Sequence, residues 1–223
     1  MCYRTVVCLF AFVLFLATSP LTAECIVYQQ LPGPHSNSAL TSSTIDGVGG
    51  IPGLKTADNF QLAQSADITG VRWWGLHSMA SDGSNGFQFT FYADEGGNPG
   101  TALHTTGGSL VTHADVPTNW TTQYESEFTL PFSATAGTTY WISVFNGAPL
   151  ASWFWLRADL SGDNSRQGYL PVTSWGVGLE DRAFQLIGVP EPATIVLISV
   201  GLLGLMALSR RRPVATGAVR SES

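Results

Sequence analysis

The chain has 223 residues, of which 12% are charged and 44% are hydrophobic, and its formal net charge is −6. This length accommodates one all-β domain with processing segments, and the composition argues against a disordered chain or a helical bundle. Between residues 26 and 188, five basic residues stand against 13 acidic ones, a net charge of −8. We therefore expect no nucleic-acid partner, because the phosphates would be repelled.

Residues 1–23 have the order of features that is typical of a secretory signal peptide. Arg4 gives a short positive segment, an apolar run follows over residues 6–17, and small residues at 19–23 offer a cleavage site. A buried N-terminal strand or helix is the alternative, but it does not require this order. The sequence therefore predicts an exported protein.

Cys25 is the one cysteine that remains once Cys2 and Cys8 have left with the signal peptide. No internal disulfide can form, so the stability of the domain must come from its core. Glu24 stands where a lipoprotein signal requires a small residue, and we therefore do not expect Cys25 to be lipidated. In an oxidising compartment this thiol stays free or pairs with another molecule.

The exported segment, residues 24–188, shows the two-residue periodicity of β-strands. Phenylalanines alternate with polar residues over 87–93, and residues 124–132 repeat the pattern with their carboxylates facing outward. Further strands are predicted at 138–145 and 182–187. One face of each strand is thus expected to be buried.

Turn-forming residues stand between these runs, at 82–86, 94–100, 136–137 and 161–164. Gly, Asn and Asp at such places supply the positive φ angles that tight connections require. Short strands, regular turns and the lack of an amphipathic helix predict an all-β fold. We expect an antiparallel β-sandwich that is jelly-roll-like.

No motif in the sequence marks an enzyme. There is no H-E-x-x-H pair, no G-x-S-x-G nucleophile elbow and no Gly-rich phosphate loop, and the histidines lie far apart, at His35, His77, His104 and His113. A glycoside hydrolase needs only two carboxylates across a cleft, and the candidates are Glu125, Glu127, Glu180 and Asp181. Alternation places the first two on a solvent face, which favours ordinary surface charge. We predict that the protein is not an enzyme.

Tryptophans are the candidates for contact with a glycan, because a flat aromatic face buries the apolar surface of a sugar ring. The candidate residues are Trp74, Trp120, Trp153, Trp155 and Trp175. For each of them a place in the core is the competing interpretation. Trp73 and Trp74 point to opposite faces of one strand, so at least one of them should be core.

Oxygen ligands at loop spacing occur at residues 94–95 and 159–164. They resemble calcium ligands in type, but neither segment completes an EF-hand loop, and plain turns explain both. We predict no metal and no cofactor.

The C-terminal segment contains an uncharged apolar run, residues 193–208, followed by Arg210, Arg211 and Arg212. As a helix these 16 residues would measure about 24 Å, slightly less than the hydrocarbon core, and could span it with local thinning. A buried core helix is the alternative. The arginines favour a transmembrane helix, with residues 213–223 as a short cytoplasmic tail and the preceding domain outside.

Val189, Pro190, Glu191 and Pro192 lie directly before this helix, and the two prolines keep Glu191 in an exposed, extended stretch. The order of this motif, the apolar helix and the arginines resembles the PEP-CTERM sorting signal of bacterial surface proteins. The resemblance covers residues 189–212. It implies recognition by a membrane-embedded exosortase, cleavage near the motif, and release or attachment at the cell surface, often in bacteria that make exopolysaccharide.

Most of the mature chain is similar to the sandwich domains of many exported proteins with C-terminal sorting signals. The segments that carry this likeness are residues 57–60, 68–75, 89–94, 97–100 and 136–144. We predict a cell-surface or extracellular-matrix protein with a structural or adhesive role. A carbohydrate-binding module that uses exposed tryptophans is the alternative, and an exported glycoside hydrolase is the third hypothesis.

Overall fold

The computed structural model describes residues 24–33, 39–45, 52–77, 86–116, 121–147, 152–159, 162, 165–178 and 180–191. The predicted signal peptide, transmembrane helix and cytoplasmic tail lie outside these ranges. Within them the chain is all-β, and its compact unit is Leu21–Pro190. None of the described residues belongs to a helix that could cross a membrane.

Thirteen strands make up the described part of the chain. They are β1 (Cys25–Gln30), β2 (Ala39–Thr41), β3 (Ser43–Ile45), β4 (Pro52–Gln61), β5 (Ala66–His77), β6 (Phe87–Asp94), β7 (Pro99–Val116), β8 (Thr121–Ala134), β9 (Thr139–Asn146), β10 (Trp153–Leu156), β11 (Arg166–Tyr169), β12 (Gly176–Val177) and β13 (Phe184–Pro190).

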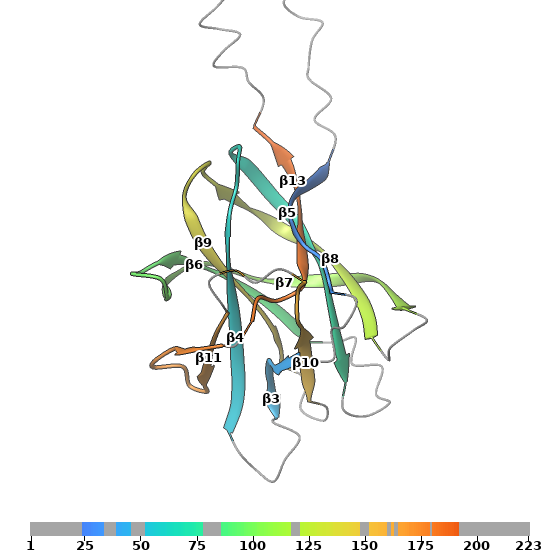
Figure 1. Ribbon diagram of the computed structural model, residues 1–223. Coiled ribbons are helices and arrows are strands. Elements are labelled where there is room, and N and C mark those ends of the chain that lie inside the picture. The colour runs from blue at the N-terminus through green and yellow to red at the C-terminus, as the bar shows by residue number, and fades with distance from the viewer. Residues whose placement is uncertain are drawn as a thin grey trace, which may run out of the picture. The chain divides into compact units, whose positions relative to one another are not determined.

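The strands form two layers (Figure 1). Sheet 1 has the order β1-β13-β5-β8-β7, with β10 and β2 continuing beside β5. Sheet 2 has the order β7-β6-β9-β4-β11-β12, with β3 between β9 and β4. All pairings of the described strands are antiparallel except a single parallel pair between β3 and β9.

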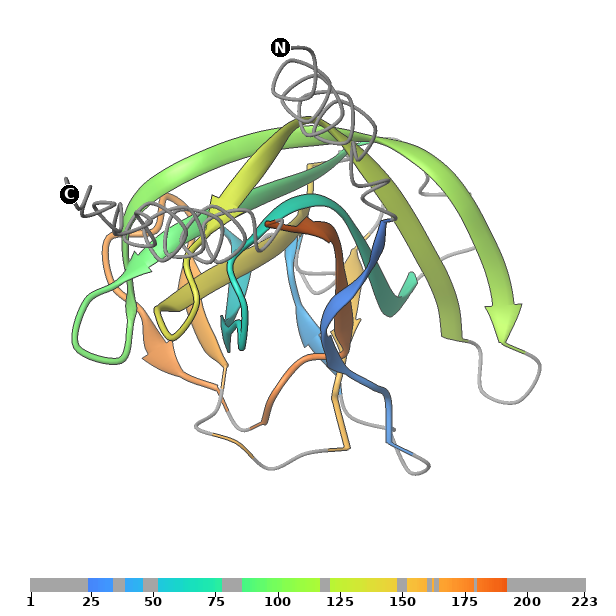
Figure 2. The ribbon, with the colours of Figure 1, turned by 90° about the horizontal axis from the view of Figure 1, so that it is seen from above.

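Strand β7 belongs to both layers. It pairs with β6 up to Gly107 and with β8 from Gly108 onward. Seen from above, it sweeps in a broad arc from one layer to the other (Figure 2). This crossing joins the two sheets along one side of the domain.

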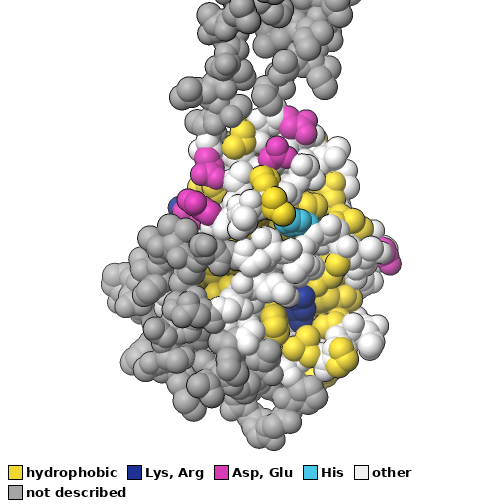
Figure 3. Space-filling model, turned by 180° about the vertical axis from the view of Figure 1, so that it is seen from behind, with side chains coloured by type: hydrophobic (Ala, Val, Ile, Leu, Met, Phe, Trp, Pro, Cys, Tyr) yellow, Lys and Arg dark blue, Asp and Glu magenta, His cyan; other side chains and the backbone are white. Residues whose placement is uncertain are grey.

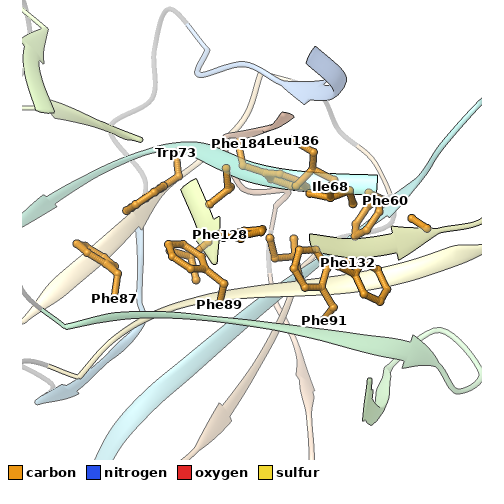
Figure 4. Close-up of a cluster of buried hydrophobic side chains, with 14 of the residues drawn as sticks. Phe60, Ile68, Trp73, Phe87, Phe89, Phe91, Phe128, Phe132, Phe184 and Leu186 are labelled. Carbon is orange, nitrogen blue, oxygen red and sulfur yellow. The ribbon is translucent and has the colours of Figure 1, made fainter. Parts of the chain in front are cut away.

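Aromatic side chains from both sheets fill the space between the layers (Figure 4). Trp73 of β5 lies edge-on to Phe87 and Phe89 of β6, with ring centroids 4.9 and 5.0 Å apart. Phe91 stacks on Phe132 of β8 at 4.4 Å. Each such pair contributes about 0.5–1.5 kcal/mol beyond the free energy gained by burying its surface. This core can therefore stabilise a domain without a disulfide.

The structure confirms the predicted fold class at the level of an all-β, antiparallel domain that is consistent with a β-sandwich. Strand β6 covers the predicted run 87–93, and its phenylalanines face the core while Gln88 is exposed. The expectation that only one face is buried was wrong here, because Thr90 and Tyr92 on the other face are buried as well. The other predicted strands correspond to β8, β9 and β13. The jelly-roll-like order stays a prediction.

Two predicted turns contain glycines in the left-handed region. Gly96 and Gly97 have φ values of 65° and 80° between β6 and β7, and Gly137 has a φ of 70° between β8 and β9. Residues with a Cβ rarely adopt such angles, so glycine is required at these connections.

Candidate functional site

The end of β13 carries the first residues of the predicted sorting signal. Val189 pairs with Asp67 of β5, and Pro190 pairs with Ala66. Glu191 follows immediately and is exposed. Strand β13 therefore ends within the Pro-Glu-Pro segment, and no linker separates the two. Pro192 and the arginines of the predicted signal, Arg210 to Arg212, lie outside the described residues.

Gly188 marks a change of register just before this end. The pairing of β13 with β5 shifts between Ile187 and Gly188, which also pairs with Cys25 of β1. A Cβ at Gly188 would lie 2.6 Å from the carbonyl oxygen of Asp67. The bulge therefore needs glycine, because only glycine permits so close an approach of two strands.

Two of the predicted glycan contacts are core residues. Trp153 and Trp155 of β10 have no exposed surface and belong to the main aromatic cluster. Their faces cannot meet a sugar ring, so the prediction was wrong for these two residues. The alternation of β10 points both rings into the space between the sheets, because the outer side of the strand carries Phe154.

The other predicted tryptophans have different surroundings. Trp74 is 7% exposed and packs with Leu156 and Ala183 in a small cluster on the opposite side of β5 from Trp73. Trp120 lies outside the described residues. Trp175 is half-buried, so it is the predicted tryptophan whose ring remains partly accessible in the described part of the chain.

Trp175 covers the outer face of sheet 2, where a second aromatic cluster lies. The cluster consists of Ala57, Tyr92 and Trp141, and Trp175 meets Tyr92 edge-on with ring centroids 5.9 Å apart. Trp141 is fully buried, and its Nε1 donates a hydrogen bond of 2.7 Å to Asp94 Oδ1. Sequence reasoning missed Trp141, although its alternation with the core residue Ile142 would have placed it on the outer face.

Two cations lie on this outer face. The Nζ of Lys55 is 5.6 Å from the ring centroid of Tyr92 and 5.7 Å from that of Phe145. The guanidinium of Arg166 lies 5.1 Å from the ring of Trp141, and its Nε donates to Asn98 Oδ1 at 2.9 Å. Both contacts have the geometry of cation–π interactions.

A buried ionic cluster joins the two sheets from inside. Asp58 of β4 has no exposed surface, and its Oδ2 accepts a hydrogen bond of 2.6 Å from the backbone N–H of Arg182. The Arg182 side chain is also fully buried and donates to the carbonyl oxygens of Glu180 and Trp155. Burial raises the pKa of Asp58 well above its usual value, although the hydrogen bond from Arg182 opposes this shift.

Three of the four carboxylates that were considered for hydrolysis are engaged in other contacts. Glu180 Oε1 lies 2.7 Å from Arg157 Nη1, and the backbone N–H of Gly162 donates to Asp181. On β8, Glu125 pairs with Arg72 at 2.6 Å, while Glu127 is exposed. These contacts tie strands and loops together.

In the first predicted ligand segment, residues 94–95, both carboxylates accept hydrogen bonds from the protein itself, whereas most of the second segment, 159–164, lies outside the described residues. Asp94 accepts from Trp141 and from the backbone N–H of Gly97, and Glu95 accepts from both the backbone and the hydroxyl of Thr101. Within the described ranges, no three His, Cys, Asp or Glu residues come together in a way that could hold a metal ion.

Taken together, the fold and the end of β13 define a β domain that carries a C-terminal sorting segment. The model of the PEP-CTERM protein-sorting motif matches residues 188–212, which begin at the bulge of β13. The chain therefore carries a PEP-CTERM sorting motif, and this match concerns the motif rather than the β domain. Comparison with curated proteins finds no match. The motif indicates an exported protein that is sorted through the membrane by an exosortase.

Proposed function

We propose that the β domain is carried across the membrane by the signal peptide 1–23, held there by helix 193–208, and then cleaved near Pro190-Glu191-Pro192. The product would serve at the cell surface or in the extracellular matrix. The match of residues 188–212 to the sorting motif supports this proposal most directly.

The end of β13 fits such a cleavage. The strand holds the chain up to Pro190, and Glu191 is exposed directly after it. Proline at the end of a strand removes a donor and prevents a helix from running back into the sheet. A protease would therefore meet an exposed residue directly after the last strand of a folded domain, which is a favourable place for cleavage.

Intact-mass analysis of the wild type and of Glu191→Ala tests this proposal. Both are expressed in a host with an exosortase, and the membrane, surface and medium fractions are compared. We expect the wild type to lose the residues beyond about Pro190 and the variant to stay uncleaved in the membrane. Glu127→Ala, which removes another exposed carboxylate, is the matched control. If wild type and Glu191→Ala both retain Arg210 to Arg212, the cleavage proposal fails.

For the sorted domain we propose a structural or adhesive role without catalysis. The engaged states of Glu125, Glu180 and Asp181 support this reading, because a general acid or nucleophile must be able to reach a substrate. Deletion of the gene should reduce cell aggregation or matrix retention, and the wild-type gene should restore it. Turnover of a polysaccharide by the purified protein that is lost in a single carboxylate variant would replace this proposal with the hydrolase hypothesis.

A carbohydrate-binding module is the second candidate function. The observation that favours it is Trp175, whose half-buried ring lies beside Tyr92 on the outer face of sheet 2.

A further inference from the structure

We propose that the outer face of sheet 2 binds an acidic polysaccharide, with the Lys55 ammonium contacting a sugar carboxylate and the Trp175 ring packing against the sugar. This inference deepens the adhesive role and rests on it, since it names the chemical class of the ligand. It does not depend on cleavage by an exosortase.

Lys55 is the first reason to expect an anionic ligand. Its ammonium has three donors, and Thr90 Oγ1 accepts one of them at 3.3 Å. None of the ion pairs among the described residues involves Lys55. The side chain is only partly exposed, and the rings of Tyr92 and Phe145 hold its charge in place. A fixed cation that has no carboxylate partner in the described part of the chain is a ready contact for an anionic group.

The aromatic residues beside Lys55 favour a sugar as the carrier of that anion. Tyr92 contacts both Lys55 and Trp175, so the cation and the accessible indole lie beside the same ring. The apolar face of a pyranose ring can pack on an indole while its substituents reach neighbouring polar groups. Trp141 supports Tyr92 from within the same cluster and is itself held by Asp94.

The charge distribution also fits an acidic ligand. The segment between residues 26 and 188 has a net charge of −8, yet Lys55 and Arg166 both lie on this face. Seen from behind, most of the acidic side chains in view lie toward the upper end of the domain (Figure 3). A uronic acid polymer combines carboxylates with sugar rings, so it matches both features. Nucleic acid would instead need an extended basic surface.

Binding of the full-length protein in detergent to immobilised polygalacturonate tests this site. We expect saturable binding that weakens when salt is added, because exposed charges are screened. Lys55→Met keeps the aliphatic stem and removes the charge, and it should weaken binding about tenfold. Trp175→Ala should weaken binding by a similar factor. Arg157→Met removes a positive charge that is already paired with Glu180, and it should leave binding unchanged.

A matched ligand separates the role of charge from that of the sugar ring. Methyl-esterified polygalacturonate has the same backbone with its charges removed, and the wild type should bind it about as weakly as Lys55→Met binds the acid form. The absence of saturable binding to polygalacturonate, or equal binding by wild type and Lys55→Met, would overturn the proposal. If Trp175→Ala unfolds, as judged by circular dichroism, the Lys55→Met comparison still decides. Normal processing together with absent binding would refute this site alone.

Discussion

Replacement of Asp58 by alanine tests whether the buried ionic cluster holds the two sheets together. Asp58 lies on β4 of sheet 2, and it accepts from the backbone N–H of Arg182, which precedes β13 of sheet 1. It also accepts from the backbone N–H of Asn59 at 3.0 Å. The side-chain amide of Gln30 also donates to the Asp58 carboxylate, at 3.0 Å, in the orientation of the amide that satisfies all of its hydrogen-bond partners.

The expected loss of stability follows from these contacts. A buried donor left without an acceptor costs about 1–3 kcal/mol. Asp58→Ala would leave the backbone N–H groups of both Arg182 and Asn59 without their acceptor, so we expect a loss of about 2–5 kcal/mol in the free energy of unfolding. Since domains of this kind are stable by about 5–15 kcal/mol, the variant should fold but unfold at much lower urea concentration. Tryptophan fluorescence during urea titration measures this change.

Titration of Asp58 should make the free energy of unfolding depend on pH. Burial raises the pKa of Asp58 in the folded state above its usual value of 3.8. The folded protein therefore holds this proton more tightly, and its contribution to stability is largest below the unfolded-state pKa and is lost as pH rises through the folded-state pKa. In Asp58→Asn this group cannot titrate. The stability of the wild type relative to Asp58→Asn should therefore fall as the pH is raised from about 4 toward neutrality.

Asp67→Ala provides the control for Asp58, because Asp67 is exposed and accepts a hydrogen bond of 2.5 Å from Ser133. Loss of this exposed hydrogen bond should lower the free energy of unfolding by less than about 1 kcal/mol. If Asp58→Ala lowers the free energy of unfolding no more than Asp67→Ala does, the buried cluster does not hold the two sheets together.

Three further substitutions address the strand end, the surface and the core. Gly188→Ala brings a Cβ to 2.6 Å from the Asp67 carbonyl oxygen and should lower the melting temperature by several degrees, at about 2–4 °C per kcal/mol, in calorimetry. A double-mutant cycle on Arg72 and Glu125, whose side chains are 29% and 23% exposed, should give a coupling below about 1 kcal/mol that shrinks in salt. Trp153→Ala should cost about 3–5 kcal/mol in urea unfolding, and a smaller loss would contradict its place in the core.

Alternation along single strands could be predicted from the sequence because it is a local property of the backbone. It placed Phe87, Phe89 and Phe91 on the buried face of β6 correctly. It also separated Trp73 from Trp74, of which at least one was expected in the core. Both are buried because β5 is covered on its two faces, a condition that alternation alone does not reveal.

The contacts between distant segments could not be predicted in this way. Asp58 and Arg182 are 124 positions apart, and no local pattern indicates that the two meet. Alternation puts Trp153 and Trp155 on one face of a short strand, but it does not say whether that face is core or surface. That choice depends on the pairing of β10 with β5, which turns both rings toward Phe87 and Phe184.

The overlap of β13 with the sorting motif limits where cleavage can occur without damage to the fold. Residues 188–190 belong both to the motif match and to the strand that pairs with β5. A cut before Gly188 would remove the partners of Asp67 and Ala66 and would shorten a strand that lies between β1 and β5. A cut after Pro190 leaves every described pairing of β13 in place. The sheet thus favours a scissile bond on the C-terminal side of Pro190, and intact masses that end before Gly188 would contradict this assignment.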